Sequence, residues 1–230
     1  MVRRFLGIWC LLFCLLMGCG TSYQWSKSHP AYHQAPAGTL AVIGSENAFL
    51  LTRSSWFAKK LEIGADSVQV TMRNFCEKKF LQELSRFYPT LTKIPDKELQ
   101  VFPEESQRLD ERIFMKGRLP EQGISLKDSA GNIPPLLLIL HEVIIGTDLK
   151  REDYFDYALM QNESPEKKTS NNLSAIASYT LWDNVKQRPL FSAVDEIQIP
   201  IQKPNLGNFE QMTAKIVQKI KENLDKGVVR

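Results

Sequence analysis

Apolar residues recur along this chain with two spacings, and each spacing predicts a different kind of element. From Ser67 to Tyr88 they return every three or four residues, which places them on one face of an amphipathic helix ended by Pro89. Phe209 to Leu224 repeats this pattern near the end of the chain, with Asn208 as the expected N-cap. Two such helices need an apolar surface to cover.

Short apolar runs without helical spacing predict the strands of that surface. Thr39–Ile43 lies between two glycines and is expected to be the first strand, and Leu99–Phe102 is a second candidate, ended by a proline. The run Pro135–Gly146 is apolar almost throughout, so both of its faces are expected to be covered. This run is therefore predicted to be a central strand.

The last strands are expected to form a hairpin. Ala175–Trp182 and Pro189–Ile199 flank a polar segment that contains Asp-Asn, a common turn pair. Because the second run does not alternate perfectly, a bulge is expected near Asp195. Residues 104–134 are expected to be a long connection with one short element around Arg112–Met115.

This order of elements predicts an α+β fold. A mainly antiparallel or mixed sheet would be covered by two amphipathic helices in a single domain. The domain is expected to span residues 39–230.

The N-terminus has the organisation of an export signal. Arg3 and Arg4 precede an apolar run from Phe5 to Met17, and the small residues Gly18–Gly20 follow it. The run is shorter than the roughly 20 apolar residues that cross a bilayer as a helix. Residues 1–18 are therefore predicted to be a signal peptide.

The end of this segment, Leu16-Met17-Gly18-Cys19, resembles the lipobox of bacterial lipoproteins, although Met17 is a less usual residue at its position. The resemblance implies cleavage before Cys19, a diacylglycerol on its thiol and acylation, such as palmitate, on its amino group. Two or more acyl chains hold a protein stably on a bilayer. A plain cleaved signal and an uncleaved anchor are the alternatives.

Residues 19–38 lack apolar periodicity and contain prolines and small polar residues, so they are expected to be a flexible tether after the lipidated cysteine. Gly20 stands where enteric lipoproteins retained in the inner membrane often have Asp. By that resemblance the periplasmic face of the outer membrane is the favoured location.

Composition narrows the possible chemistry. The formal charge is +3, and loss of Arg3 and Arg4 would leave +1, so no nucleic-acid partner is expected. After cleavage and lipidation, Cys76 would be the one free thiol, which excludes an intramolecular disulfide and a cysteine-rich zinc site. Cys76 lies on the apolar stripe of its helix and is expected to be a packing residue.

Candidate chemistry is sparse, and neither a catalytic residue, a metal site nor a cofactor is predicted. His141-Glu142 lacks the second histidine of a zinc-protease motif, because position 145 is Ile145. Adjacent strand residues point to opposite faces, so His141 is expected to be a partly buried sheet residue. The aromatic residues Tyr154, Phe155 and Tyr157 are the expected interaction patch.

The mature chain loosely resembles a group of envelope lipoproteins. Its "GTLAVIG" strand, the helix "VTMRNFCEKKFLQELSRF" and the strand pair "ASYTLWDNVKQRPLFSAVDEIQI" follow the order of elements in penicillin-binding-protein activators, the curli-secretion lipoprotein and the N-terminal domain of the Tol-system propeller protein. The resemblance implies a non-catalytic module for envelope assembly that binds an envelope protein partner. It carries no functional residue over to this chain.

Two alternatives to this hypothesis remain. A periplasmic carrier or sensor of a small apolar ligand would need a sizeable apolar cavity between helices and sheet. A carboxylate-dependent envelope hydrolase would need two acidic side chains facing each other in one cleft.

Overall fold

A seven-stranded mixed sheet organises the part of the chain that the structure describes. The structure is a computed structural model, and the described residues are 23–29, 39–109, 114–147 and 172–226. The strands are β1 (Tyr23–Ser28), β2 (Leu40–Ile43), β3 (Phe49–Leu51), β4 (Thr92–Lys93), β7 (Leu136–Thr147), β8 (Asn172–Asp183) and β9 (Arg188–Pro200). Their order is β1-β9-β8-β7-β2-β4, and β3 also pairs with β7.

The long strand β7 is central, as its apolar sequence predicts. β2 and β3 pair with it in parallel on one side, and β8 pairs with it antiparallel on the other. β8 and β9 form the predicted hairpin. The sheet is therefore mixed, and the predicted α+β class with a single domain is confirmed.

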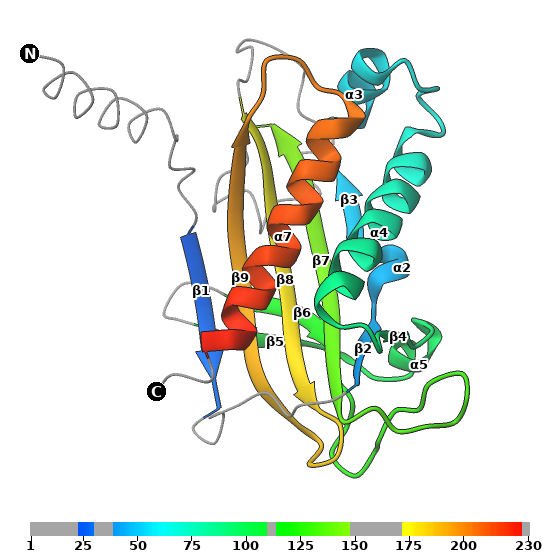
Figure 1. Cartoon of the computed structure of the whole chain (residues 1–230), viewed down its shortest axis with the longest axis vertical. Helices are drawn as coiled ribbons and strands as arrows, with labels where there is room; N and C mark the ends of the chain where they lie inside the picture. Colours follow the sequence, from blue (N-terminus) through cyan, green and yellow to red (C-terminus); the bar gives the residue numbers. More distant parts are fainter. Residues whose placement is uncertain (1–22, 30–38, 110–113, 148–171, 227–230) are drawn as a thin grey trace, which may run out of the picture.

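Helices cover one face of the sheet, called here the helix face. α4 (Val68–Phe87) and α7 (Leu206–Lys226) lie side by side across it, with α3 (Ser54–Leu61) at one end (Figure 1). Phe80 of α4 contacts Phe49 edge to face, with ring centroids 5.8 Å apart, and Phe57 of α3 contacts Phe209 of α7 in the same way at 5.3 Å. α4 and α7 thus correspond closely to the two helices that the spacing of apolar residues predicts.

Cys76 is buried in the packing between α4 and α7, as expected. Its side chain is 1% exposed, and burial raises the pKa of the thiol to about 12. At neutral pH the thiol is protonated and shielded from solvent, which is the state of a packing residue.

The N-cap of α7 differs from the expected one. The helix begins at Leu206, so Asn205 is the cap and Asn208 lies three residues further on. The Asn208 amide N–H donates to Asn205 Oδ1 at 3.1 Å, and the Asn205 amide N–H donates to Asn208 Oδ1 at 3.0 Å. This reciprocal pair is the arrangement of a capping box.

The opposite face, called the hairpin face, is covered by elements that the sequence did not indicate. β5 (Glu104–Arg108) and β6 (Phe114–Arg118) form an antiparallel hairpin where one short element was expected. The predicted strand at Leu99–Phe102 is wrong, since Lys97–Gln100 forms the short helix α5. Leu99 and Phe102 then turn into a small core with residues of β2 and β7.

Residues 19–38 were expected to be a flexible tether, but the structure has a strand in the middle of this segment. Tyr23–Ser28 form β1, which pairs with β9 from Tyr23↔Glu196 to Ser28↔Phe191. The His29 amide N–H continues the pairing by donating to the Leu190 carbonyl at 2.8 Å. The unpaired backbone edge of β9 explains the strand, because it offers hydrogen-bond partners whatever the side-chain pattern of the incoming segment. Residues 19–22 and 30–38 lie outside the described residues.

The expected bulge near Asp195 is also wrong. β9 alternates regularly there, and its register shift lies opposite Leu181 and Trp182. Asp195 faces the helices, where Tyr179 Oη donates to its Oδ2 at 2.7 Å and Asn223 Nδ2 donates to the same oxygen at 3.1 Å. The break in the apolar pattern is thus a buried, hydrogen-bonded carboxylate within a regular strand.

Candidate functional site

The residues predicted to act in function are not among those that the structure describes. The lipidation candidate Cys19 and the aromatic patch Tyr154, Phe155 and Tyr157 all fall outside the described ranges. The described residues offer two other features, an apolar surface at one end of the sheet and a charged pocket on the hairpin face.

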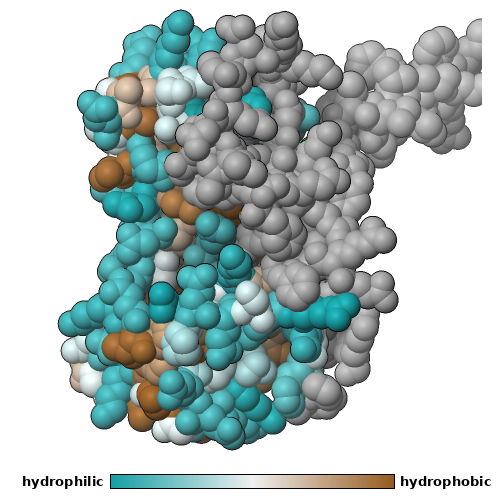
Figure 2. All heavy atoms as spheres, turned by 180° about the vertical axis from the view of Figure 1, so that it is seen from behind, coloured by the Kyte–Doolittle hydropathy of each residue, from teal (hydrophilic) through white to brown (hydrophobic). Residues whose placement is uncertain are grey.

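The first feature, called here the sheet-end surface, consists of Ile124, Ile133 and Val185. Their side chains are 40%, 48% and 64% exposed. They belong to the turn between β8 and β9 and to the connection that leads into β7. Figure 2 shows apolar side chains at this lower end of the molecule among a mostly polar surface. Single exposed apolar residues are common, but three beside one structural centre make this end of the sheet a candidate contact surface.

That structural centre is Asn184, which is fully buried. Its side-chain Nδ2 donates to the carbonyls of Leu126 and Pro134 at 2.8 and 2.9 Å, and its Oδ1 accepts from the Leu126 amide at 2.9 Å. Its own amide N–H donates to the Pro135 carbonyl at 3.0 Å. One asparagine therefore joins the β8–β9 turn to the connection before β7.

Two further hydrogen bonds hold the same two segments together. The Gly123 amide N–H donates to Gln187 Oε1 at 2.8 Å, and Ser125 Oγ donates to the Asn184 carbonyl at 2.9 Å. Each of the three apolar side chains is thus next to a residue fixed by these hydrogen bonds. A surface that is ordered before binding loses less conformational entropy when a partner docks.

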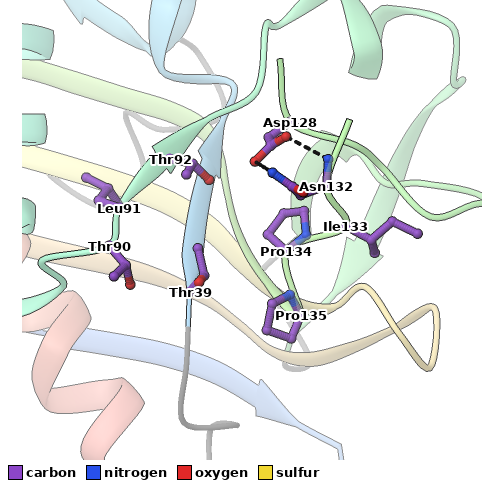
Figure 3. A pocket seen from close by; sticks show the side chains of 9 residues that line it. All are labelled: Thr39, Thr90, Leu91, Thr92, Asp128, Asn132, Ile133, Pro134 and Pro135. Atoms are coloured by element: carbon purple, nitrogen blue, oxygen red, sulfur yellow. Dashed lines mark hydrogen bonds between the residues drawn. The ribbon is translucent and has the colours of Figure 1, made fainter. Parts of the chain in front are cut away.

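A pocket of about 370 Å³ adjoins this surface (Figure 3). Thr39 before β2 and the segment Thr90–Thr92, which leads into β4, line one side, and the segment before β7 lines the other. The lining residues are Thr39, Thr90, Leu91, Thr92, Asp128, Asn132, Ile133, Pro134 and Pro135. Ile133 belongs to both the pocket and the sheet-end surface, so the two features are continuous.

The wall formed by Asp128 and Asn132 is held by its own hydrogen bonds. Asp128 Oδ1 accepts from the amides of Ala130 and Asn132, each at 2.9 Å. The backbone hydrogen bond from Asn132 is the main cause that lowers the pKa of the Asp128 carboxyl. The carboxylate is thus used to shape the loop, and the pocket offers hydroxyl and apolar groups to a ligand.

The second feature is a pocket of about 310 Å³ between β7, α5, the β5–β6 hairpin and the short helix α2 (Ser45–Ala48). A bulge between Leu140 and Glu142 interrupts the alternation of β7. His141 and Glu142 consequently both line this pocket, although adjacent strand residues were expected to face opposite ways. Local sequence gives no signal of such a bulge.

Charged groups on the hairpin modify the chemistry of Glu142. Burial raises the pKa of Glu142 to about 7, the nearby carboxylate of Glu104 adds to the rise, and Lys116 opposes it. Glu142 can therefore bind and release a proton near neutral pH, which a general acid requires. The pair Glu104 and Glu142 partly meets the condition set for a carboxylate-dependent hydrolase.

His141 is held in a chain of polar contacts across the sheet. Its Nε2 lies 2.9 Å from Thr180 Oγ1, which lies 3.0 Å from Ser192 Oγ. Burial lowers the pKa of His141 to about 4, so the imidazole is neutral at pH 7. Gly117 of β6 packs directly on the ring, since a Cβ there would lie 2.2 Å from Nδ1. His141 is thus a partly buried sheet residue, as expected.

Neither a membrane-spanning helix nor a metal cluster is found in the described ranges. No helix there is long and apolar enough to cross a bilayer. No group of three or more His, Cys, Asp or Glu residues is placed there to hold a metal ion. The carrier hypothesis needed an apolar cavity under the helices; Phe57, Phe80 and Phe209 lie there fully buried in one core with residues of the sheet.

Comparison with known proteins gives a distant likeness to solved structures alone. No family model and no curated protein matches the chain. A PelC dodecamer from Paraburkholderia phytofirmans has 8% identity and a TM-score of 0.41, with 90% of this chain and 97% of that one covered. A point variant of the same dodecamer has 8% identity and a TM-score of 0.35, with 86% and 95% covered. At these values the likeness assigns no function to this chain.

Proposed function

We propose that this protein is a lipid-anchored lipoprotein of the bacterial cell envelope whose domain binds another envelope protein without catalysing a reaction. The basic, apolar and small-residue segments of residues 1–18, followed by Cys19, support export and lipidation. The sheet-end surface supports the binding role. The periplasmic face of the outer membrane is the proposed location.

The observation that carries the binding role is the combination of exposure and rigidity at the sheet-end surface. Ile124, Ile133 and Val185 are exposed, while the backbone beside them is fixed by the buried Asn184. Burying an aliphatic side chain contributes about 25 cal/mol per Å² of apolar area, so three of them can supply a small hot spot. The adjoining pocket can receive an apolar side chain of the partner.

Site-specific photocrosslinking in cells tests this role. A photoreactive amino acid at Val185 is expected to capture one dominant envelope protein, identified by mass spectrometry. Val101 is the matched control, because it is also a valine, is 77% exposed, and lies directly after α5 in a different segment from the three residues of the sheet-end surface. The same adduct should weaken at least several-fold in Cys19→Ser, which lacks the anchor.

Two results would contradict the proposal. Equal adducts from positions 185 and 101 would mean that the sheet-end surface is not a specific interface. Unchanged acyl-chain labelling in Cys19→Ser would mean that Cys19 is not the lipidated residue.

A carboxylate-dependent hydrolase is the second candidate function, favoured by the position of Glu104 beside the partly buried Glu142. In glycoside hydrolysis one carboxylic acid donates a proton and a second carboxylate acts as base or nucleophile. If this function holds, purified protein releases reducing ends from isolated cell-wall glycan. Glu142→Gln should then abolish the release, and Glu105→Gln, an exposed change on β5, should not. Absence of release from wild-type protein would reject this candidate.

A further inference from the structure

We infer that the lipid anchor holds the β1 edge of the sheet against the bilayer and keeps the pocket beside the sheet-end surface on the far side of the domain. The inference rests on the proposed lipidation of Cys19. It goes beyond that proposal by specifying which part of the described fold faces the membrane.

The first step is the length of chain between anchor and fold. Cys19 and Tyr23 are four residues apart in the sequence. A chain spans at most about 3.5 Å per residue, so Tyr23 lies within about 14 Å of Cys19 in any conformation. A flexible tether over residues 19–38 would have allowed roughly 70 Å by the same measure.

The second step is the attachment of β1 to the domain. β1 pairs with β9 over six positions, from Tyr23↔Glu196 to Ser28↔Phe191. Because β1 is part of the sheet, the bound of about 14 Å applies to the folded domain itself. The domain therefore cannot extend away from the membrane as it would on a long linker.

The third step is the position of the Figure 3 pocket relative to Tyr23. The pocket is lined by β4, which lies five strand steps from β1, or about 24 Å at 4.8 Å per step (Figure 1). The pocket and Tyr23 are also separated along the strand direction, as the strand register shows. Thr92 of β4 is level with Ala41, and that row leads across the sheet to Pro189, seven residues along β9 from the partner of Tyr23. Seven residues span about 24 Å, which makes the diagonal roughly 34 Å.

These lengths exclude one way of resting on the membrane. If the sheet stood upright on its β4 edge, Tyr23 would be about 24 Å above the bilayer, beyond the roughly 14 Å that the chain allows. The direction of β1 favours its own edge as the contact, since the chain toward Cys19 leaves the sheet at that edge. The pocket and the adjoining Ile133 then face the aqueous compartment, where a soluble domain of a partner can reach them.

Fluorescence quenching on vesicles tests the orientation. The acylated protein would be reconstituted in vesicles with a quencher on the lipid headgroups, carrying one dye at Ser26→Cys or at Thr90→Cys, both exposed positions. Cys76 needs no replacement, because its thiol is 1% exposed and the raised pKa keeps it protonated during labelling at neutral pH. The dye at 26 is expected to be quenched at least about twofold more than the dye at 90.

A spacer supplies the matched control. Inserting about twenty Gly and Ser residues between Ser22 and Tyr23 gives a linker with an average span of about 25 Å, so the difference between the two dyes should largely disappear. Equal quenching of both dyes without the spacer, or stronger quenching at 90, would overturn the orientation. Acyl-chain labelling of Cys19 is measured on the same sample. Its absence would overturn the proposed anchor, a result that differs from equal quenching of an acylated chain.

Discussion

At the scale of single residues, His141 and Glu142 have pKa values that burial shifts in opposite directions. Both lie in the pocket that also contains Glu104, Lys116 and Asp96. For Glu142 the pKa rises from 4.5 to about 7, and for His141 it falls from 6.5 to about 4. In both cases burial disfavours the charged form of the side chain, which makes each residue a source of pH-dependent stability.

The two contributions have opposite signs. Between pH 4.5 and 7 the folded state keeps the Glu142 proton that the unfolded state has released, so stability falls as pH rises. Between pH 4 and 6.5 the unfolded state holds a His141 proton that the folded state excludes, so stability rises with pH. From pH 4.5 to 6.5 the two contributions oppose each other in the wild-type chain.

Single substitutions should therefore separate these slopes. Relative to wild type, Glu142→Gln should make the free energy of unfolding increase with pH between 4.5 and 6.5. His141→Gln should make it decrease over the same range. Each change is expected to be about 1–2 kcal/mol, less than the full linkage value because both side chains are partly exposed. Urea unfolding at several pH values measures the pH slope of the free energy of unfolding for each variant, and Glu105→Gln is the control. Parallel slopes in the Glu142 and His141 variants would mean that the two residues do not contribute with opposite signs.

At the scale of elements, the pattern of apolar positions was sufficient where an element has its own apolar stripe or its own continuous apolar run. The helix expected from Ser67 to Tyr88 is Val68–Phe87, and the apolar run Pro135–Gly146 is the central strand Leu136–Thr147. The buried apolar residues of the helix contact one core, and those of the strand divide between that core and the small core on the hairpin face. Local sequence determines such elements because the hydrophobic contribution depends on which residues share a face.

Elements decided by distant partners were not predictable in this way. β1 has one short polar and aromatic sequence that pairs with the open edge of β9, and β5 and β6 are short strands rich in charged residues that pair mainly with each other. The same limit applies to the candidate site. Asp183-Asn184 marks the hairpin turn in the sequence, but the hydrogen bonds of Asn184 reach Pro134 and Leu126, 50 and 58 residues away. Periodicity and turn chemistry contain no information about such pairs.

At the scale of the whole molecule, the pairing of β1 means that the folded domain begins before residue 39. The sequence placed that start at residue 39, whereas the structure includes Tyr23–Ser28 in the sheet. Without β1, the edge of β9 would be open from Phe191 to Glu196, a segment whose side chains are buried. An open edge next to buried apolar residues is a site for pairing with another chain.

Two truncated chains should therefore behave differently. The fragment 23–230 is expected to be monomeric and more stable than the fragment 39–230 by about 2–4 kcal/mol, since a six-residue edge strand makes several hydrogen bonds of about 0.5–1.5 kcal/mol each. The fragment 39–230 should also self-associate at micromolar concentration through β9. Urea unfolding and light scattering after size exclusion measure the two effects, and Ser26→Pro within 23–230 should reproduce part of the loss by weakening β1. Equal midpoints and equal masses for the two fragments would mean that β1 adds nothing to the fold, and the domain would then begin at residue 39.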